Sequence, residues 1–273
     1  MYAGTTLLKD SGKRVGVHQR IDRAARLGVV KFIPKHVKFP SLKEILYFEG
    51  NNGPDGIKRK GSANDEPWHF IDPTNPNDND LIIIINDHIY NLAESLKSGN
   101  IVRSSFEAAW LAHAIVDGLT PAHHYPLGDK IEELWGKAHD DRKSLKSKLV
   151  IRGDGLKDTI SKNWQYIGAD GVFTAHLLFE AGVASAISTT NFKHCGPNRD
   201  EVNHLNEAGF EAIYREAVAK IYNLNMYKEF GKTGWTWHLA KETKTILIPE
   251  MIKIVSLAWC DAIAKAKGGN FES

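Results

Sequence analysis

The segment Trp110–His124 holds the residues of this chain with the most evident capacity for chemistry. Read as a helix, it places His113 and Asp117 four residues apart, so their side chains lie on one face, one turn from each other. Neighbours such as Ala112 and Ile115 are small or apolar, which predicts that the helix is largely buried. A carboxylate and an imidazole in an apolar interior need polar partners, and a metal ion would satisfy both.

The residues after Asp117 extend this pattern. Gly118 and Pro121 end the helix, and the chain turns to place His123 and His124 just beyond it. A helical His–Asp pair followed by a histidine in a turn can build a zinc cluster from a single segment. The alternative is a buried His–Asp hydrogen bond with surface histidines beyond it. For His124 the choice is between a spare ligand and a residue that faces substrate.

A second segment, 174–181, repeats the arrangement. His176 and Glu180 are again four residues apart and stand among Ala and Leu residues. If the two helices face each other, two imidazoles and two carboxylates meet inside a helical bundle, a common location for metal sites. The alternative is two unrelated pairs on helix surfaces. Two apolar helices that each carry such a pair are less expected by chance than one, which favours the metal site.

Length and composition narrow the class of protein. The chain has 273 residues, enough to bury a substantial core, and its formal net charge of +2 indicates no broad basic surface for nucleic acid. Two cysteines, Cys195 and Cys260, are too few for a disulfide framework. The apolar run Leu81 to Ile85 is too short to span a membrane, so no transmembrane segment is expected. The first residues lack the apolar region of a secretory signal, so the protein is either cytosolic or begins after a removed leader.

The apolar periodicity predicts helices along most of the chain. They are expected over 15–27, 41–47, 80–96, from Ser104 or Ser105 to 118, and over 129–149, 159–164, 170–187, 201–222 and 243–266. Pro249 either kinks the last helix or marks its true start. Residues 50–80 are expected to form a long irregular region. The sequence contains no repeat and no convincing strands, so it predicts an all-α fold in one domain. Five further histidines have no carboxylate at a useful spacing: His36, His88, His139, His204 and His238.

These motifs resemble those of the zinc-dependent bacterial phospholipase C and fungal-type single-strand nuclease superfamily. His113, Asp117, Pro121 and His123 are similar to its central His-x3-Asp-x3-Pro-x-His segment. His176-x3-Glu180 resembles its last ligand pair, in which the phospholipases carry Glu and the nucleases Asp.

Three further positions fit the same family order. Trp68-His-Phe-Ile-Asp72 is similar to its aromatic-His-aromatic-x-Asp segment, which makes His69 a ligand. Asp55, fourteen residues before His69, occupies the position of an aspartate in the phospholipase branch. Gly16-Val-His18 resembles the ligand segment near the N-terminus. The motifs cover most of the chain in the family's order.

The resemblance implies two zinc ions and a possible third. The first would be held by Asp55, His69, His113 and Asp117. The second would be held by His123, His176 and Glu180, with water completing its shell. The third would use His18 and share Asp117. Two such ions could clamp a phosphodiester and activate water, and Asp55 could orient or deprotonate that water.

Three departures from the family pattern matter. Family members hold the third zinc with the amine and carbonyl of an N-terminal Trp, whereas this chain begins Met1-Tyr2. We therefore expect two tightly held zinc ions and a third position that is weak or empty, because ordering an N-terminal arm costs backbone entropy. Residues 125–172 resemble an inserted helical segment. Asp65 lies closer to His69 than Asp55 does and competes for the carboxylate role.

The expected function is a phospholipase C-like zinc phosphodiesterase that hydrolyses phosphate esters of lipid head groups. One alternative is a single-strand nuclease of the same superfamily, and another is a metal-stabilised helical binding protein with little or no catalysis. The expected partner is a phosphodiester substrate, lipid head group or nucleotide, without a stable nucleic-acid complex. Family members are usually secreted.

Overall fold

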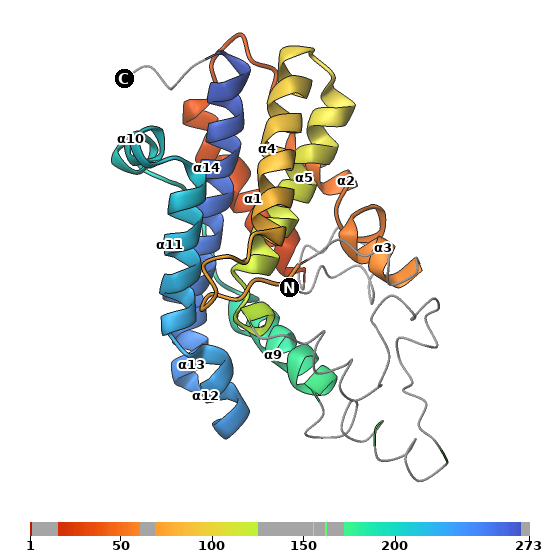
Figure 1. Cartoon of the computed structure of the whole chain (residues 1–273), viewed down its shortest axis with the longest axis vertical. Coiled ribbons are helices and arrows are strands. Elements are labelled where there is room, and N and C mark those ends of the chain that lie inside the picture. The colour runs from red at the N-terminus through yellow and green to blue at the C-terminus, as the bar shows by residue number, and fades with distance from the viewer. Residues whose placement is uncertain (2–15, 61–68, 125–154, 156–161, 163–171, 269–273) are drawn as a thin grey trace.

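The computed structural model describes residues 1, 16–60, 69–124, 155, 162 and 172–268, and every regular element among them is helical (Figure 1). The prediction of an all-α fold is confirmed. The first half contains α1 (Val17–Val29), η1 (Val30–Phe32), α2 (Leu42–Tyr47), η2 (Gly50–Asn52), α3 (Pro54–Lys60), α4 (Asp80–Lys97), α5 (Ile101–Gly118) and η4 (Pro121–His124). The second contains α9 (Val172–Ile187), α10 (Arg199–Ala208), α11 (Phe210–Asn223), α12 (Met226–Thr233), α13 (Trp237–Glu242), η6 (Thr243–Leu247) and α14 (Ile248–Ala266).

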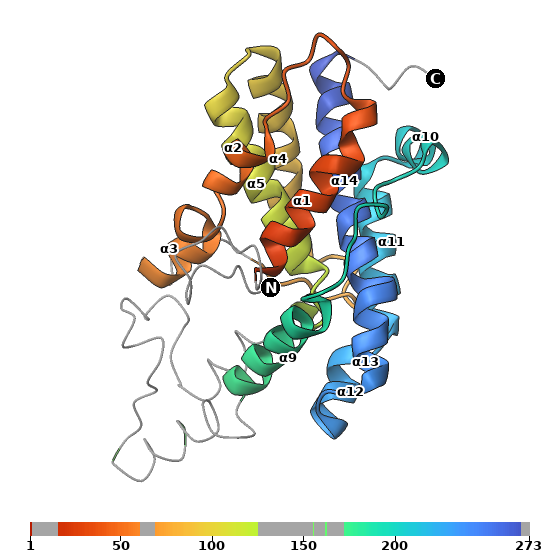
Figure 2. The ribbon, with the colours of Figure 1, turned by 180° about the vertical axis from the view of Figure 1, so that it is seen from behind.

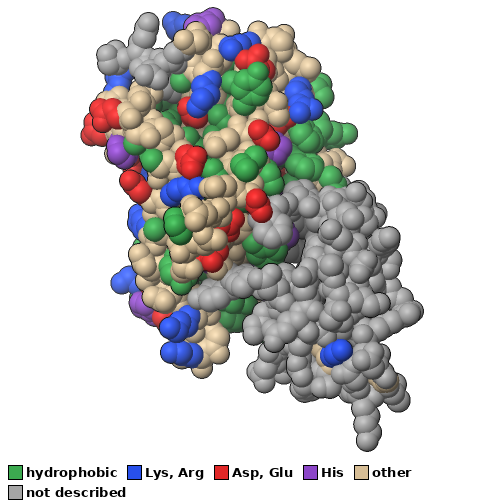
Figure 3. Space-filling view, viewed as in Figure 1, with side chains coloured by type: hydrophobic (Ala, Val, Ile, Leu, Met, Phe, Trp, Pro, Cys, Tyr) green, Lys and Arg blue, Asp and Glu red, His purple; other side chains and the backbone are tan. Residues whose placement is uncertain are grey.

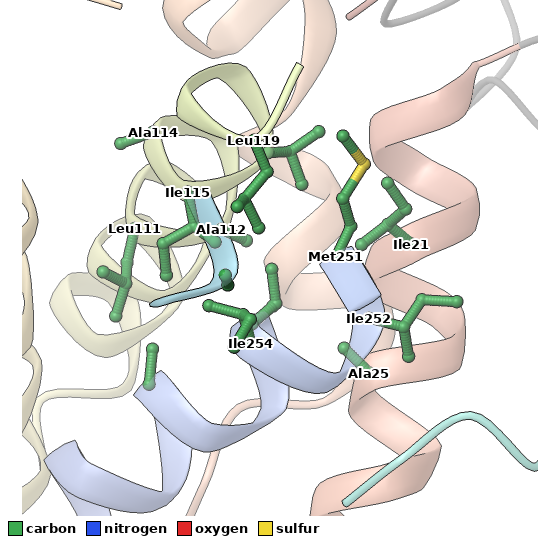
Figure 4. Close-up of a cluster of buried hydrophobic side chains, with 14 of the residues drawn as sticks. Ile21, Ala25, Leu111, Ala112, Ala114, Ile115, Leu119, Met251, Ile252 and Ile254 are labelled. Carbon is green, nitrogen blue, oxygen red and sulfur yellow. The ribbon is translucent and has the colours of Figure 1, made fainter. Parts of the chain in front are cut away.

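Four long helices form the centre of the molecule. α1, α4, α5 and α14 lie side by side along its long axis in both ribbon views (Figures 1 and 2). Figure 4 shows how Ile21 from α1, Ile115 from α5 and Met251 from α14 meet between them. Trp259 of α14 is fully buried, and its indole N–H donates to the carbonyl of Ala108 at 3.0 Å, the kind of partner that a buried indole needs. The packing of α14 against three neighbours makes it the axis of the core.

α9 lies across the lower end of these helices (Figure 1). Arg20 of α1 fixes its C-terminal end by donating to the carbonyls of Ile187 at 2.8 Å, Ser188 at 3.0 Å and Thr190 at 2.7 Å. Carbonyls at a helix C-terminus lack partners within the helix, so the guanidinium supplies what the helix leaves unpaired. The contact fixes α9 relative to the start of α1.

The other side of α9 packs on aromatic side chains from the C-terminal part of the chain. The ring of Trp235 stacks on Phe179 with centroids 5.5 Å apart, and its indole N–H donates to the carbonyl of Leu178 at 3.1 Å. This packing needs a glycine on α9, because a Cβ added at Gly182 would lie 1.7 Å from the Trp235 indole. Trp237, two residues on, is exposed.

The central helix begins earlier than expected. It starts at Ile101, because the side chain of Asn100 accepts a hydrogen bond from the backbone N–H of Arg103 at 3.1 Å and so acts as the N-cap. Ser104 and Ser105 lie inside the helix, where their hydroxyls donate to carbonyls four residues earlier. The prediction that one of these serines opens the helix was wrong.

Two other boundaries differ from the expected ones. The helix predicted over 201–222 is two helices, α10 and α11, because Gly209 adopts a φ of 80° between them. Part of the region predicted to be irregular is helical, since α3 begins at Pro54, a residue suited to a helix start. Pro249 marks the true start of α14, after the π-helical turn η6. The helices predicted over 129–149 and 159–164, within the 125–172 segment, fall almost wholly outside the described residues.

The surface matches the near-neutral charge of the chain. On the face shown in Figure 3, acidic and basic side chains are interspersed. None of the helices that the structure describes is both long enough and apolar enough to cross a membrane. The expectation that no transmembrane segment is present therefore holds for this part of the chain.

We predict that Gly182→Ala lowers the free energy of unfolding by about 1–3 kcal/mol, because the added methyl group overpacks the Trp235 contact that holds α9. The matched control is Gly231→Ala in α12, where an added Cβ has no neighbour within 4 Å. That change should be neutral or stabilising by about 0.5–1 kcal/mol, as expected for Gly to Ala within a helix. Urea unfolding of both variants measures the difference, and equal stabilities would contradict this account of the packing.

Candidate metal centre

Three chain segments that are far apart in the sequence bring their polar side chains together at the lower end of the bundle. His18 lies in the first turn of α1, His113 and Asp117 in the last turns of α5, and His176 and Glu180 on α9. All except His176 are buried, and Asp117 is fully buried. The helix-borne pairs predicted from the sequence do face one interior region.

Asp117 connects two imidazoles. Its Oδ1 lies 3.4 Å from His18 Nε2, and its Oδ2 lies 3.4 Å from His113 Nε2. The two imidazole rings stack with centroids 3.9 Å apart and planes 5° from parallel. Two donor atoms bound to one tetrahedral zinc, each about 2.0–2.1 Å from it, lie about 3.3 Å apart. The separations therefore suit donors that share a metal ion better than they suit direct hydrogen bonds.

His123, His176 and Glu180 form a second group. Glu180 Oε1 lies 3.3 Å from His123 Nε2 and 3.0 Å from His176 Nε2, and the two imidazole rings stack with centroids 4.9 Å apart. One potential donor atom from each residue lies within 4.8 Å of the others. The same criterion joins His18, His113 and Asp117. The structure thus contains two adjacent sets of three potential ligands. The first metal set is His18, His113 and Asp117, and the second metal set is His123, His176 and Glu180.

The α-amine of Met1 lies between the two sets. It is 2.7 Å from Asp117 Oδ1 and 3.2 Å from Glu180 Oε1. The sequence suggested that an N-terminal arm without Trp would have difficulty in reaching His18, and the structure nevertheless places this amine beside the same carboxylate that faces His18. The amine is a positive charge between two buried carboxylates, which shows that this position favours a cation. The number of metal ions stays a prediction.

Acceptors on the far side of the rings fix how two of the histidines point. Glu49 Oε1 lies 2.7 Å from His113 Nδ1, and the carbonyl of His69 lies 3.0 Å from His123 Nδ1. Each acceptor holds a proton on Nδ1, so the Nε2 lone pair is directed at the carboxylates of the centre. His113 Nε2 and both ring nitrogens of His18 have no hydrogen-bond partner among the described residues. A lone pair buried against carboxylates is unfavourable unless a cation or proton lies between them, so this geometry suits either a bound metal ion or a protonated imidazole at His113.

The pKa values of these groups reflect burial and the concentration of negative charge. Burial lowers the pKa of His18, and it lowers the pKa of His123 to about 4, so the neutral form of both imidazoles is favoured. Burial also lowers the pKa of His113, but the carboxylates of Glu49 and Asp117 outweigh it and raise the pKa to about 10. Burial raises the pKa of Glu180, but the Met1 ammonium and His176 have the opposite and larger effect. Together they bring the pKa of Glu180 well below its ordinary range. The carboxylate at this position is therefore charged.

The pKa of Asp22, one turn after His18 on α1, shifts in the opposite direction from that of Glu180. Burial and the neighbouring Glu49 carboxylate raise the pKa of Asp22 well above its ordinary value. The charged form of this carboxyl group is therefore disfavoured.

The two remaining residues predicted to be ligands, Asp55 and His69, lie at the edge of the centre. Asp55 lies in the first turn of α3 with its side chain 29% exposed, and its Oδ1 is 3.7 Å from His113 Nε2. The His69 ring lies 5.1 Å from the ring of His123, beside the second set. His69 belongs to neither of the two sets of three. Asp65, the competing carboxylate, lies outside the described residues.

The local fold explains how His123 reaches the centre. After α5 the chain turns, with the Thr120 hydroxyl donating to the Val116 carbonyl at 2.7 Å and the His123 N–H donating to the Thr120 carbonyl at 2.8 Å. Ile71 then donates its backbone N–H to the His123 carbonyl at 3.3 Å. Together with the bond from His123 Nδ1, this contact ties the His69 segment to η4.

Several histidines differ from what the sequence suggested. His124 is buried, and its Nε2 donates to the carbonyl of Gly118 at 2.8 Å, so this nitrogen is not free to bind a metal ion. His88 and His238 do have carboxylate partners. His88 pairs with the buried Glu107 of α5, and the exposed His238 lies near Glu242, four residues further on, and Glu229. The His238–Glu242 spacing was visible in the sequence and could have been noticed.

Glu49 is the main residue of the centre that sequence reasoning missed. It follows α2 and is buried, 64 residues before His113. No spacing connects it to the ligand motifs, and only the packing of α2 on α5 brings it there.

The donor set suits zinc. Imidazole nitrogens and carboxylate oxygens are ordinary zinc ligands, and three protein ligands in a set leave a position for water or substrate. Comparison of the chain with protein-family models, with characterised proteins and with solved structures gives no match. The interpretation of the centre therefore depends on the geometry of its residues.

We predict that His113→Ala releases metal and lowers the free energy of unfolding by about 3–5 kcal/mol, since Asp117 and Glu49 lose the imidazole between them. His88→Ala is the matched control, because it also removes the imidazole beside a buried carboxylate, Glu107. Both variants should be less stable than the parent, and only His113→Ala should lose zinc in metal analysis after dialysis. Full zinc content in His113→Ala would exclude His113 as a ligand.

Proposed function

We propose that this protein is a zinc-dependent phosphodiesterase that acts on phosphate esters of lipid head groups. The observation that carries this proposal is the convergence of two His–carboxylate sets on one buried region, with donor atoms 3.0–3.4 Å apart. Adjacent metal sites of this kind are typical of enzymes that displace groups at phosphorus. The resemblance of the sequence motifs to the phospholipase C and nuclease superfamily supports the same reading.

Two sets of residues would hold the zinc ions. The first comprises His18, His113 and Asp117, with Asp55 at its edge, and the second comprises His123, His176 and Glu180. His69 borders the second set through its ring and its carbonyl. When bound, zinc would supply positive charge against the phosphate and increase the acidity of water in the site.

The chain's own residues contribute orientation and proton transfer. Asp117 faces a different histidine with each of its oxygens, so it fixes the spacing within the first set. Asp55 is more exposed than the described carboxylates that contact the histidines of the two sets, with 29% of its side chain exposed against 10% for Glu180 and 0% for Asp117. A carboxylate that is open to solvent and beside the ligands is suited to orient an attacking water and accept its proton. Asp55 is therefore proposed as the general base, as the resemblance also implies.

Two observations favour a lipid substrate over nucleic acid. Glu180 stands where the phospholipases of the resembling superfamily carry Glu and the nucleases carry Asp. Basic side chains do not gather into one patch on the face shown in Figure 3, whereas proteins that follow a nucleic-acid backbone present a positively charged groove. A single-strand nuclease of the same superfamily is the direct competitor, and the assays must include its substrate.

We predict that protein purified without chelator contains zinc and hydrolyses phosphatidylcholine and a chromogenic phosphodiester faster than single-stranded DNA. Removing zinc with a chelator should abolish the activity, and adding zinc back should restore it, because the ligands persist in the folded chain. Preference for single-stranded DNA would establish the nuclease instead. Bound zinc without turnover of any of the three substrates would favour a metal-stabilised helical binding protein.

We also predict that Asp55→Asn lowers kcat by about 10²–10⁴-fold, the usual contribution of a general base, while zinc in the second set is retained. Asp80→Asn is the matched control, because Asp80 also lies in the first turn of a helix, α4, but is exposed and on an element that supplies none of these ligands. Steady-state kinetics and zinc analysis of both variants test this role. An Asp55→Asn enzyme with the kcat of the parent would exclude Asp55 as the base.

A further inference from the structure

Among the described residues, Glu49 contacts the centre through the side chain of His113. Its Oε1 lies 2.7 Å from His113 Nδ1, on the opposite side of the ring from Asp117. Glu49 is 4% exposed and His113 is 2% exposed, so water does not compete for the hydrogen bond. Glu49 lies between α2 and η2 and His113 lies in α5, so their contact depends on tertiary packing.

We infer that Glu49 is a positioning residue, which holds His113 in the tautomer and orientation that direct Nε2 at the first metal set. A neutral histidine that binds metal through Nε2 carries its proton on Nδ1, and Glu49 Oε1 lies where that N–H donates, 2.7 Å away. Nε2 then faces Asp117 Oδ2 at 3.4 Å and Asp55 Oδ1 at 3.7 Å, as a ligand would. Carboxylates that accept from the second nitrogen of a ligating histidine orient the ring and increase its basicity. This inference rests on the proposed zinc centre and adds a residue to it.

The fold holds Glu49 firmly in place. α2 begins with a capping box, in which the Ser41 side chain accepts from the Glu44 N–H and the Glu44 carboxylate accepts from the Ser41 N–H. At the other end of α2, the ring of Phe48 packs edge-on against Phe106 of α5, with centroids 5.7 Å apart. Phe48 directly precedes Glu49, so the aromatic contact with α5 sets the position of the carboxylate along that helix. A side chain held in this way can orient the ring that it contacts.

The same helix offers an internal comparison. Glu107 of α5 is fully buried and accepts from the Nδ1 of the half-buried His88, so it forms a second histidine–carboxylate pair, and it also pairs with Arg103. Neither residue belongs to the two metal sets, and the pair joins α4 to α5. Loss of this carboxylate, like loss of Glu49, removes a buried hydrogen-bond partner of a histidine, but without the expected effect on zinc.

The test compares Glu49→Leu and Glu49→Gln with Glu107→Gln. Glu49→Leu removes the acceptor at similar volume and should weaken zinc binding in one set by about 10–100-fold, the usual effect of losing such a partner. Glu49→Gln keeps a carbonyl acceptor and should weaken it less. Glu107→Gln should lower stability and leave both zinc affinities at the parent values. Competition with a chromophoric chelator measures the affinities, and unfolding measurements report stability.

Heteronuclear NMR of the histidine rings gives a readout that a purely structural role would not change. In the parent and in Glu49→Gln, His113 should carry its proton on Nδ1 and bind zinc through Nε2. Zinc bound through Nδ1 in the parent would overturn the inference even if Glu49→Leu failed to fold. A folded Glu49→Leu variant with parental zinc affinity would also overturn it.

The outcomes separate this inference from the proposed function. If zinc binding depends on Glu49 but no phosphodiester is hydrolysed, the positioning role stands and the proposed reaction falls. If phosphodiesters are hydrolysed and Glu49→Leu binds zinc as the parent does, only the role of Glu49 falls. A parent protein that binds no zinc would overturn both.

Discussion

Two carboxylates without access to bulk water are the constraint on which the rest of this structure depends. Asp117 is fully buried and Glu180 nearly so, and an isolated carboxylate in an apolar interior is strongly unfavourable. The fold meets this cost by surrounding them with imidazoles and with the Met1 amine, which lies within 3.2 Å of both. The high pKa of His113, about 10, has the same origin, since the carboxylates around it stabilise positive charge. A centre that attracts a proton and an amine so strongly is also suited to a divalent cation, and this electrostatic demand links the architecture to the proposed chemistry.

The bundle meets that demand by bringing helix ends and a turn to one place. α5 supplies His113 and Asp117 in its last turns, α1 supplies His18 in its first, and the turn after α5 delivers His123. α9 crosses the end of the bundle instead of running along it (Figure 1), so its position depends on specific contacts. Arg20 fixes its C-terminal carbonyls, and the Trp235 ring packs over Gly182. These packing contacts lie outside the candidate metal centre, yet they determine whether His176 and Glu180 meet His123.

The histidine–carboxylate pairs were predictable because an α-helix places residues i and i+4 on one face, whatever the tertiary structure. The same local rule, with capping and proline chemistry, gave the short helix after Ser41 and the start of the last helix near Pro249. It failed where a stronger local signal was overlooked. Asn100 caps the central helix ahead of two serines, and Gly209 divides a helix that its apolar pattern made continuous. The errors are thus errors of helix boundary, and the helical class of the fold was not affected.

What the sequence determined by itself was the all-α class and the identity of two His–carboxylate pairs, because periodicity and i, i+4 spacing are local properties of the chain. Tertiary structure decided which pairs meet and what stands behind them. It placed His18 against Asp117, His69 beside His123, and Glu49 against His113 across 64 residues of sequence. No spacing rule connects such residues, because their distance is set by how α2, α5 and the segment around His69 pack. That packing is cooperative, since burying one polar group requires partners from several elements at once. Which residues make up each set of potential ligands is therefore decided only in the folded chain.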